Sequence, residues 1–292
     1  MKIAVYGRSF SKDFSGNVRE LFRKLKGYNV NIAVFAPFYR FLKEKAGFDP
    51  EVHSTYSGYE DFETGTDFVL SIGGDGTILE SISLVRDTGI PIIGINSGKL
   101  GFLASIAKEE INEAIDNIMK GNYSLEERSL IQIVSPENLF GNFSYCLNEI
   151  TIQKKNSKMI TIHTYLNGDF LNSYWADGLI ISTPTGSTAY SLSTGGPIIT
   201  PDSGVFIVSP IAPHNLTVRP LVIPDKNEIT LEVDFRYSEF LVSMDFYTSS
   251  LENSMKIVLK KAPFTIRLVN LNYQNFYSTL RNKLMWGVDK RN

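Results

Sequence analysis

The chain has 292 residues, a formal net charge of −2 at neutral pH and a single cysteine. At about 150 residues per domain, this length predicts two domains with sizeable cores, with one large domain as the alternative. Hydrophobic residues make up 43% of the chain and charged residues 21%, values that exclude a disordered protein. A general duplex-DNA binder is also disfavoured, because neutralising phosphates requires a basic surface.

The cysteine, the histidines and the N-terminal residues indicate the compartment. Cys146 cannot form a disulfide within the chain, and the three histidines are scattered, which disfavours a zinc site. The first apolar run is interrupted by Gly7 and Arg8 and is too short for a secretory signal. No run approaches the ~18 apolar residues of a membrane span. We therefore expect a cytoplasmic protein without nucleic-acid or membrane partners.

Residues 1–120 alternate short apolar runs, which predict strands, with apolar residues at helical spacing. Because strands that alternate with helices need crossover connections, this region predicts an α/β domain with a mostly parallel sheet. The expected strands are 3–6, 30–35, 68–72 and 91–95, and the expected helical stripes lie within 18–25, 78–85 and 111–118.

The pattern changes after about residue 122. Strand-like runs follow one another with few helical patterns, which predicts a β-rich, largely antiparallel domain. Asn167-Gly168 lies between two of these runs and is a typical hairpin-turn sequence. The expected strands are 130–134, 143–153, 159–165, 177–182, 205–208, 228–233, 240–244 and 255–260.

The C-terminal segment 273–284 returns to a helical pattern, with Phe276, Leu280 and Leu284 on one face. We expect this helix to pack back on the first domain. The sequence thus predicts an α/β domain of residues 1–121, joined by residues 271–292, and a β-rich domain of residues 122–270.

The sharpest motif is Gly73-Gly74-Asp75-Gly76-Thr77, directly after the predicted strand 68–72. A glycine turn lets the backbone approach a phosphate, and the following helix offers free N–H groups and the positive end of its dipole. Since a carboxylate repels phosphate, Asp75 suggests metal binding or proton transfer from an attacking hydroxyl. The alternative is a tight strand-to-helix turn with Asp75 near the N-cap.

Two further segments have polar groups suited to a ligand. Residues 94–104 follow a predicted strand at the sheet edge where open α/β folds bind ligands. Glu149 could accept two bonds from a ribose diol, and Asn148 could both donate and accept. If both side chains touch one ligand, the strand must bulge or end there. A Gly-rich connection and a strand edge are the structural alternatives.

Two more polar segments lie further along the chain. The stretch 183–197, after Asp177-Gly178, is rich in small hydroxyl residues and suits a close-fitting polar surface, with Tyr190 offering a flat face. A Ser/Thr-rich loop is the alternative. In the segment 209–215, His214 between turn residues is more often a structural hydrogen-bonding group than a catalyst.

Taken in order, these segments resemble the NAD kinase family over most of the chain. The resemblance depends on the ordered set, since the glycine–aspartate motif alone looks similar in lipid kinases and phosphofructokinases. It implies transfer of the γ-phosphoryl group of ATP to the 2′-hydroxyl of the adenosine ribose of NAD, giving NADP. It also implies Mg²⁺ or another divalent cation with the ATP, a nucleotide-binding first domain, an NAD-binding second domain, and a homo-oligomer, often a tetramer. The segments that carry it are 73–77, 96–104, 148–149, 177–178 with 183–190, and 210–214.

The resemblance implies roles for single residues as well. Asp75 resembles the proton acceptor, and Asn148 and Glu149 match the pair that holds the adenosine end of NAD. Asp177 matches the carboxylate near the nicotinamide end. No side chain is predicted as a metal ligand. The other expected contacts are Gly76, Phe102, Thr188, Ala189, Tyr190, Ser193 and Ala212 for NAD, and Gly73, Gly74 and Thr77 for the phosphates of ATP.

Two positions depart from the family pattern. Phe246-Tyr247 follows Asp245 where many members have Gly-Gln, and Trp175 replaces a basic residue two positions before Asp177. Two other functions stay open: a lipid kinase of the diacylglycerol or sphingosine type, and a non-catalytic NAD(H)-binding regulator. Against the first, residues 96–102 lack the Gly-Thr-Gly-Asn-Asp run of those enzymes. Against the second, pure binding has no need of a base such as Asp75.

Overall fold

The computed structural model describes residues 1–62, 65–98, 100–234, 239–252, 255–271 and 275–287. The chain divides into two compact units, Met1–Glu127 with Ile266–Asn292 and Arg128–Thr265. Two long strands, β6 (Tyr123–Ser135) and β17 (Lys256–Leu271), contribute residues to both units. The predicted domain limits, at residues 121 and 271, lie a few residues from the divisions after Glu127 and before Ile266. That these limits separate two functional domains stays a prediction.

The first unit contains a parallel sheet. Its strands have the order β17-β5-β4-β1-β2-β3, and each neighbouring pair is parallel. The predicted fold class is confirmed for this unit, because crossover helices connect the strands. Besides β17, the strands are β1 (Lys2–Gly7), β2 (Asn31–Phe35), β3 (Ser54–Tyr56), β4 (Phe68–Gly73) and β5 (Ile92–Asn96).

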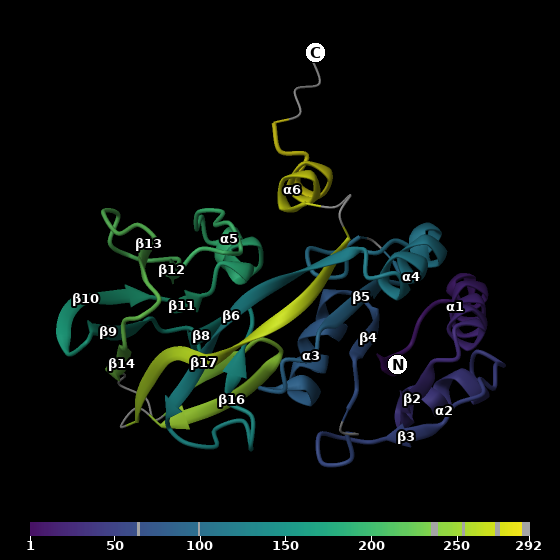
Figure 1. Cartoon of the computed structure of the whole chain (residues 1–292). Helices are drawn as coiled ribbons and strands as arrows, with labels where there is room; N and C mark the ends of the chain where they lie inside the picture. Colours follow the sequence, from purple (N-terminus) through teal and green to yellow (C-terminus); the bar gives the residue numbers. More distant parts are fainter. Residues whose placement is uncertain (63–64, 99, 235–238, 253–254, 272–274, 288–292) are drawn as a thin grey trace. The chain divides into compact units, whose positions relative to one another are not determined.

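The helices of this unit, labelled in Figure 1, bury the apolar stripes that the sequence shows. One helix, α2, was not predicted, because its aromatic residues continue the apolar run of β2 and hide the change of period. Its start is marked by a proline in the first turn, where a missing N–H costs nothing. The helices are α1 (Ser15–Gly27), α2 (Ala36–Glu44), α3 (Asp75–Val85), α4 (Ile111–Met119) and α6 (Phe276–Leu284), with short 3₁₀ turns at Lys12–Phe14 and Lys108–Glu110.

The C-terminal helix α6 belongs to the first unit. Its Leu280 is buried, whereas Leu284 is 37% exposed, so only part of the predicted apolar face is covered. The ammonium of Lys283 lies 5.0 Å from the centroid of the Phe102 ring. Residues 273 and 274 of the predicted helix fall outside the described residues. Among the helices that the structure describes, none is long and apolar enough to cross a membrane.

The second unit contains a six-stranded antiparallel sheet of order β13-β12-β11-β8-β15-β16. Its strands β10-β9-β14-β17 are the antiparallel end of the 11-stranded sheet that continues from β17 to β5. Residues 185–188 and 190–193 add a 3₁₀ turn and the short helix α5 (Tyr190–Ser193). The remaining strands are β7 (Tyr145–Cys146), β8 (Glu149–Lys154), β9 (Ile160–Leu166), β10 (Asp169–Ala176), β11 (Gly178–Ser182), β12 (Val205–Ile211), β13 (Leu221–Pro224), β14 (Ile229–Asp234), β15 (Glu239–Met244) and β16 (Tyr247–Glu252).

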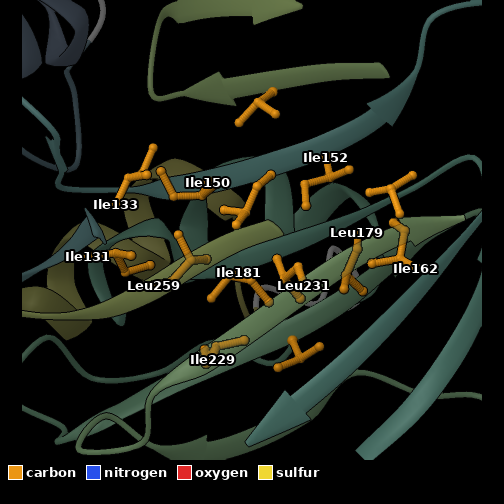
Figure 2. Close-up of a cluster of buried hydrophobic side chains, with 14 of the residues drawn as sticks. Ile131, Ile133, Ile150, Ile152, Ile162, Leu179, Ile181, Ile229, Leu231 and Leu259 are labelled. Atoms are coloured by element: carbon orange, nitrogen blue, oxygen red, sulfur yellow. The ribbon is translucent and has the colours of Figure 1, made fainter. Parts of the chain in front are cut away.

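The core of this unit takes side chains from both sheets (Figure 2). Alternate residues of β8, such as Ile150 and Ile152, are fully buried in this cluster. Because neighbouring residues of a strand face opposite sides, Glu149, Thr151 and Gln153 point to the other face of the sheet. The polar groups proposed for ligand binding are therefore on the side of β8 that faces away from the core.

Two local predictions can be compared with the backbone. Asn167 and Gly168 have φ values of 52° and 89°, as a two-residue hairpin turn between β9 and β10 requires. The single strand expected over 143–153 is wrong, because the chain forms β7 and β8 with a break at residues 147 and 148. Such a break is what the sequence requires if the side chains of Asn148 and Glu149 both contact one ligand.

Candidate functional site

The first group of candidate residues lies where β4 ends and α3 begins. Gly74 is the N-cap of α3 and Asp75 is its first residue. At Gly73 a Cβ atom would lie 2.0 Å from the hydroxyl oxygen of Thr77, so only glycine fits this bend. Gly74 and Gly76 are exposed. The first N–H groups of a helix have no acceptor within the helix, so this end of α3 can receive an anion.

The carboxylate of Asp75 is held by three consecutive backbone N–H groups. Phe102 donates to Oδ2 at 2.8 Å, and Leu103 and Ala104 donate to Oδ1 at 3.0 and 2.9 Å. Gly101 is required beside them, because a Cβ there would lie 1.7 Å from Oδ1. A carboxylate has about four lone-pair positions. Oδ1 uses two and Oδ2 uses one, which leaves Oδ2 able to accept one further hydrogen bond.

The predicted segment 94–104 therefore reaches Asp75 through its backbone. A Cβ at Gly94 would lie 2.5 Å from the Ile78 side chain and 2.9 Å from Ala104 Cα, so the loop packs closely on α3. Asn96 closes the turn by accepting the N–H of Gly98 at 2.6 Å. The predicted residues of this unit are thus brought together at the carboxyl ends of β4 and β5; they are Gly73, Gly74, Asp75, Gly76, Thr77 and Phe102.

In the second unit, two residues satisfy the whole backbone of Leu147, Asn148 and Glu149. The carboxylate of Asp245 accepts their N–H groups at 2.9, 2.9 and 3.2 Å, and its own N–H donates to the carbonyl of Glu149 at 3.1 Å. Thr183 donates its hydroxyl to the carbonyl of Leu147 and its N–H to that of Asn148. The break before β8 is therefore fixed, and the side chains of Asn148 and Glu149 are left for other contacts.

Burial changes the acid–base behaviour of this carboxyl pair. Loss of water and then the charge of Asp245 raise the pKa of Glu149 to about 8, against a backbone hydrogen bond from Tyr190 that lowers it. Loss of water also raises the pKa of Asp245 to about 6, although its three N–H partners oppose this shift. The Oε2 atom of Glu149 is buried and lacks a hydrogen-bond partner among the described residues. Such an atom favours a ligand that brings its own donor.

Tyr190 connects the two ends of β8. Its backbone N–H donates a hydrogen bond to the carboxyl group of Glu149, and its hydroxyl accepts a hydrogen bond from Nε2 of Gln153 at 3.0 Å. The preceding loop stays close to this strand because Gly186 has no side chain: a Cβ there would lie 2.2 Å from the carbonyl oxygen of Asn148. The structure therefore places the loop predicted for the dinucleotide along the polar face of β8; its candidate residues are Thr188, Ala189, Tyr190 and Ser193.

At the far end of β8, Asp177 forms an ion pair with Lys154. Its N–H donates to the carbonyl of Ile211 at 3.0 Å, which brings the predicted residue Ala212 nearby. Ala212 is exposed and has a φ of 44°, an uncommon conformation for alanine. Lys154 is followed by Lys155, whose ammonium pairs with Glu239 at the surface.

The two departures from the family pattern occupy exposed positions. Trp175 is 50% exposed, and its ring centroid lies 4.3 Å from that of His214. The backbone N–H of His214 donates to the carbonyl of Trp175 at 2.9 Å, and a structural role for its side chain stays a prediction. Phe246 is 45% exposed and packs on Tyr247 with a centroid separation of 4.2 Å.

The contacts that sequence reasoning missed are those of Asp245, Thr183, Lys154 and Gly101. The sequence placed Asp245 only at the end of a strand. Its φ of 49° is a turn conformation for which aspartate is favoured, but no local signal pointed to partners nearly 100 residues earlier. Within the described part of the chain, no cluster of three or more histidine, cysteine, aspartate or glutamate side chains could hold a metal ion.

Comparisons with known proteins agree across both units. Residues 10–123 match the model of the ATP-NAD kinase N-terminal domain, and residues 147–271 match that of the ATP-NAD kinase C-terminal domain. An NAD kinase from Cytophaga hutchinsonii is 44% identical over 293 residues, with 100% of both chains covered. The fold is similar to that of yeast NADH kinase complexed with NADH, with a TM-score of 0.87, 23% identity, and coverage of 99% of this chain and 89% of that chain. An NAD kinase from Archaeoglobus fulgidus in complex with ATP gives a TM-score of 0.76 at 24% identity, covering 98% and 99%.

Proposed function

The chain belongs to the NAD kinase family, and we propose that it transfers the γ-phosphoryl group of ATP to the 2′-hydroxyl of the adenosine ribose of NAD through the residues described above. The prediction of the family from ordered motifs is confirmed. The comparisons give no support to a lipid kinase or to a non-catalytic regulator. The roles of single residues in this reaction are proposals from their geometry.

The observation that carries the catalytic proposal is that Oδ2 of Asp75 accepts only one hydrogen bond from the described residues. Three N–H groups fix the carboxylate at the start of α3, and Oδ2 can still accept one proton. The 2′-hydroxyl gives its proton to Oδ2 as its oxygen bonds to the γ-phosphorus. The bond from that phosphorus to the bridging oxygen of ADP breaks, and ADP leaves with the electron pair. A positioned base of this kind contributes typically 10²–10⁴-fold.

The phosphates of ATP are expected at the glycine turn before α3. Gly74 and Gly76 are exposed, and the first turn of the helix offers N–H groups and a positive dipole end. Gly73 and Thr77 shape this turn by packing against each other. We expect the divalent cation to enter with ATP as part of the substrate and to be held by its phosphates.

NAD is expected to use the polar face of β8. Glu149 would accept the ribose diol of the adenosine end with its buried, unpartnered Oε2, and Asn148 would bind beside it. Asp177 would lie toward the nicotinamide end. Phe102 and Ala212 would supply apolar walls. The remaining contacts that we propose are Gly76, Thr188, Ala189, Tyr190 and Ser193.

The direct test is the reaction itself. Purified protein is incubated with ATP, Mg²⁺ and NAD, and NADP is detected with an NADP-specific dehydrogenase. We expect NADP to form with the phosphate on the 2′ position, and we expect no phosphorylation of diacylglycerol or sphingosine under the same conditions. Absence of NADP with intact NAD binding would instead favour a regulator. A homo-oligomer, often a tetramer in the family, and a cytoplasmic location stay predictions that sedimentation and localisation experiments can check.

A further inference from the structure

Asp245 forms hydrogen bonds to every residue of one short segment, residues 147–149. Its carboxylate and its N–H make four hydrogen bonds to Leu147, Asn148 and Glu149, from the turn between β15 and β16. This turn is held beside the segment because Met244 pairs with Ile150 of β8. Partners so far apart in the chain are brought together by the sheet alone.

Thr183 contacts the same segment from the other side of β8, because it follows β11, whereas Asp245 follows β15. Its hydroxyl and its N–H donate to the carbonyls of Leu147 and Asn148, and the hydroxyl also accepts the N–H of Gly186 at 3.1 Å. Together, Asp245 and Thr183 satisfy every backbone N–H and carbonyl of residues 147–149. Leu147 and Asn148 lie between β7 and β8, and only Glu149 has a strand partner, Ser182 of β11, so these two residues make most of the contacts that fix the path of the segment.

The path of this segment decides where two candidate ligand groups point. In an unbroken strand, Asn148 and Glu149 would face opposite sides of the sheet. Here β7 ends at Cys146 and β8 begins at Glu149, so Asn148 lies in the irregular part between them. A side chain that must meet a ligand atom within a few tenths of an ångström needs a fixed backbone beneath it.

We propose that Asp245 is a positioning residue for NAD: together with Thr183 it fixes the backbone of residues 147–149 so that Asn148 and Glu149 present their side chains to the adenosine end of the dinucleotide. This inference rests on the proposed function, because it assumes that these side chains bind NAD. It adds a residue that does not itself touch the substrate. Removing its carboxylate should therefore weaken the use of NAD and leave the use of ATP nearly unchanged.

The principal variant is Asp245→Asn, which keeps Oδ1 and a turn-compatible side chain but opposes the N–H of Leu147 with an amide N–H. We expect the KM for NAD to rise by about ten-fold and the KM for ATP to change by less than about two-fold. Asp169→Asn, an exposed aspartate beside the other hairpin turn, is the matched control and should leave both constants unchanged.

A mutant cycle separates positioning from a general loss of structure. If Asp245 acts through Asn148 and Glu149, Asp245→Asn should have little further effect on the KM for NAD once Asn148→Ala and Glu149→Ala are both present. Equal increases in the KM for NAD and the KM for ATP would overturn the proposal. It would also be overturned if Asp245→Asn raised the KM for NAD by the same factor with and without the alanine substitutions. Calorimetric binding of NAD gives the same comparison without turnover. A wild-type chain that binds NAD but makes no NADP would contradict the proposed function while leaving this inference testable.

A second pair of variants tests the inference if Asp245→Asn does not fold. Thr183→Ser keeps the hydroxyl that donates to Leu147, whereas Thr183→Val removes it at nearly the same volume. We expect Thr183→Val to raise the KM for NAD about five-fold and Thr183→Ser to restore most of the loss. Identical NAD constants for the two variants would overturn the role given to this segment.

Discussion

Asp75 in the first unit and Asp245 in the second accept hydrogen bonds in the same arrangement from different residues. Each carboxylate accepts three consecutive backbone N–H groups, with the first bound to Oδ2 and the next two to Oδ1. In both places the donors belong to an irregular segment that follows or precedes a strand. The same bonding pattern thus fixes a loop in two unrelated parts of the chain.

The surroundings of the two carboxylates differ. Asp75 stands between two exposed glycines at the start of a helix, so a substrate can approach it. Asp245 lies at a hairpin turn beside Glu149, and loss of water raises its pKa to about 6. The comparison teaches that the N–H partners set the orientation of a carboxylate, whereas its neighbours determine whether it meets a substrate or only holds the backbone.

The largest effect should come from Asp75→Asn. An amide cannot take the proton of the 2′-hydroxyl, so we expect kcat to fall by at least ~100-fold with a much smaller change in NAD affinity. Steady-state NADP formation and calorimetric NAD binding measure the two quantities. Asp87→Asn, an exposed aspartate just beyond the other end of α3, is the control. Turnover of Asp75→Asn within a few-fold of the wild type would show that Asp75 is not the base.

Two glycines allow the comparison to be tested from the loop side. A Cβ at Gly101 would meet Asp75 Oδ1, and a Cβ at Gly186 would meet the carbonyl oxygen of Asn148. We expect Gly101→Ala to lower kcat on the order of 30-fold and Gly186→Ala to raise mainly the KM for NAD, since small displacements of reacting groups are costly. Gly16→Ala, with open space around its Cβ position, serves as the control. The same kinetic defect in both variants would contradict the proposal that Asp75 acts in the chemical step and that the segment around Asn148 acts in NAD binding.

The pH dependence of NAD binding should report on Glu149. Its pKa is raised to about 8, so the free protein holds it mostly protonated at neutral pH. A diol that donates to the carboxylate binds the ionised form, so affinity should increase as pH rises, by up to about ten-fold between pH 7 and pH 9, and level off above the pKa. Calorimetry between pH 7 and pH 9 measures this affinity, and we expect it to show release of a proton when NAD binds. Glu149→Gln should abolish the slope; a slope that persists there would assign it to another group.

The smallest effect is expected at the ion pair of Asp177 and Lys154. Both side chains are partly exposed, at 36% and 26%, so the pair should contribute little. We expect Lys154→Met to change the KM for NAD by about two-fold and the KM for ATP not at all. Lys155→Met, which removes a neighbouring surface pair with Glu239, is the control. A ten-fold change for Lys154→Met would mean that the pair positions the dinucleotide.

Much of the fold was predictable because central strands and amphipathic helices have strong patterns. The strands that were missed lie at the ends of their sheets: β3, β10, β13 and β16. In β10, for example, only Tyr174 and Ala176 are buried, so the alternation that marks a half-buried strand is absent. An edge strand is specified by pairing with its neighbour, which the local sequence does not display.

The candidate site was predictable where a motif brings its own chemistry, as at Asp75 and at the Asn148-Glu149 pair. What holds these groups in place was not predictable. The donors to Asp75 come from residues 102–104, and those to Asp245 lie nearly 100 positions away, so both depend on the packed fold. A lone aspartate at a turn has no sequence feature that distinguishes it from a solvated one.

The most direct test of the central claim is a crystal structure of the protein with NAD bound. We expect Oδ2 of Asp75 within hydrogen-bond reach of the adenosine 2′-oxygen, about 2.6–3.2 Å, while the N–H groups of residues 102–104 still hold the carboxylate. A bound dinucleotide whose 2′-hydroxyl lies far from Asp75, with that carboxylate facing solvent, would contradict the account.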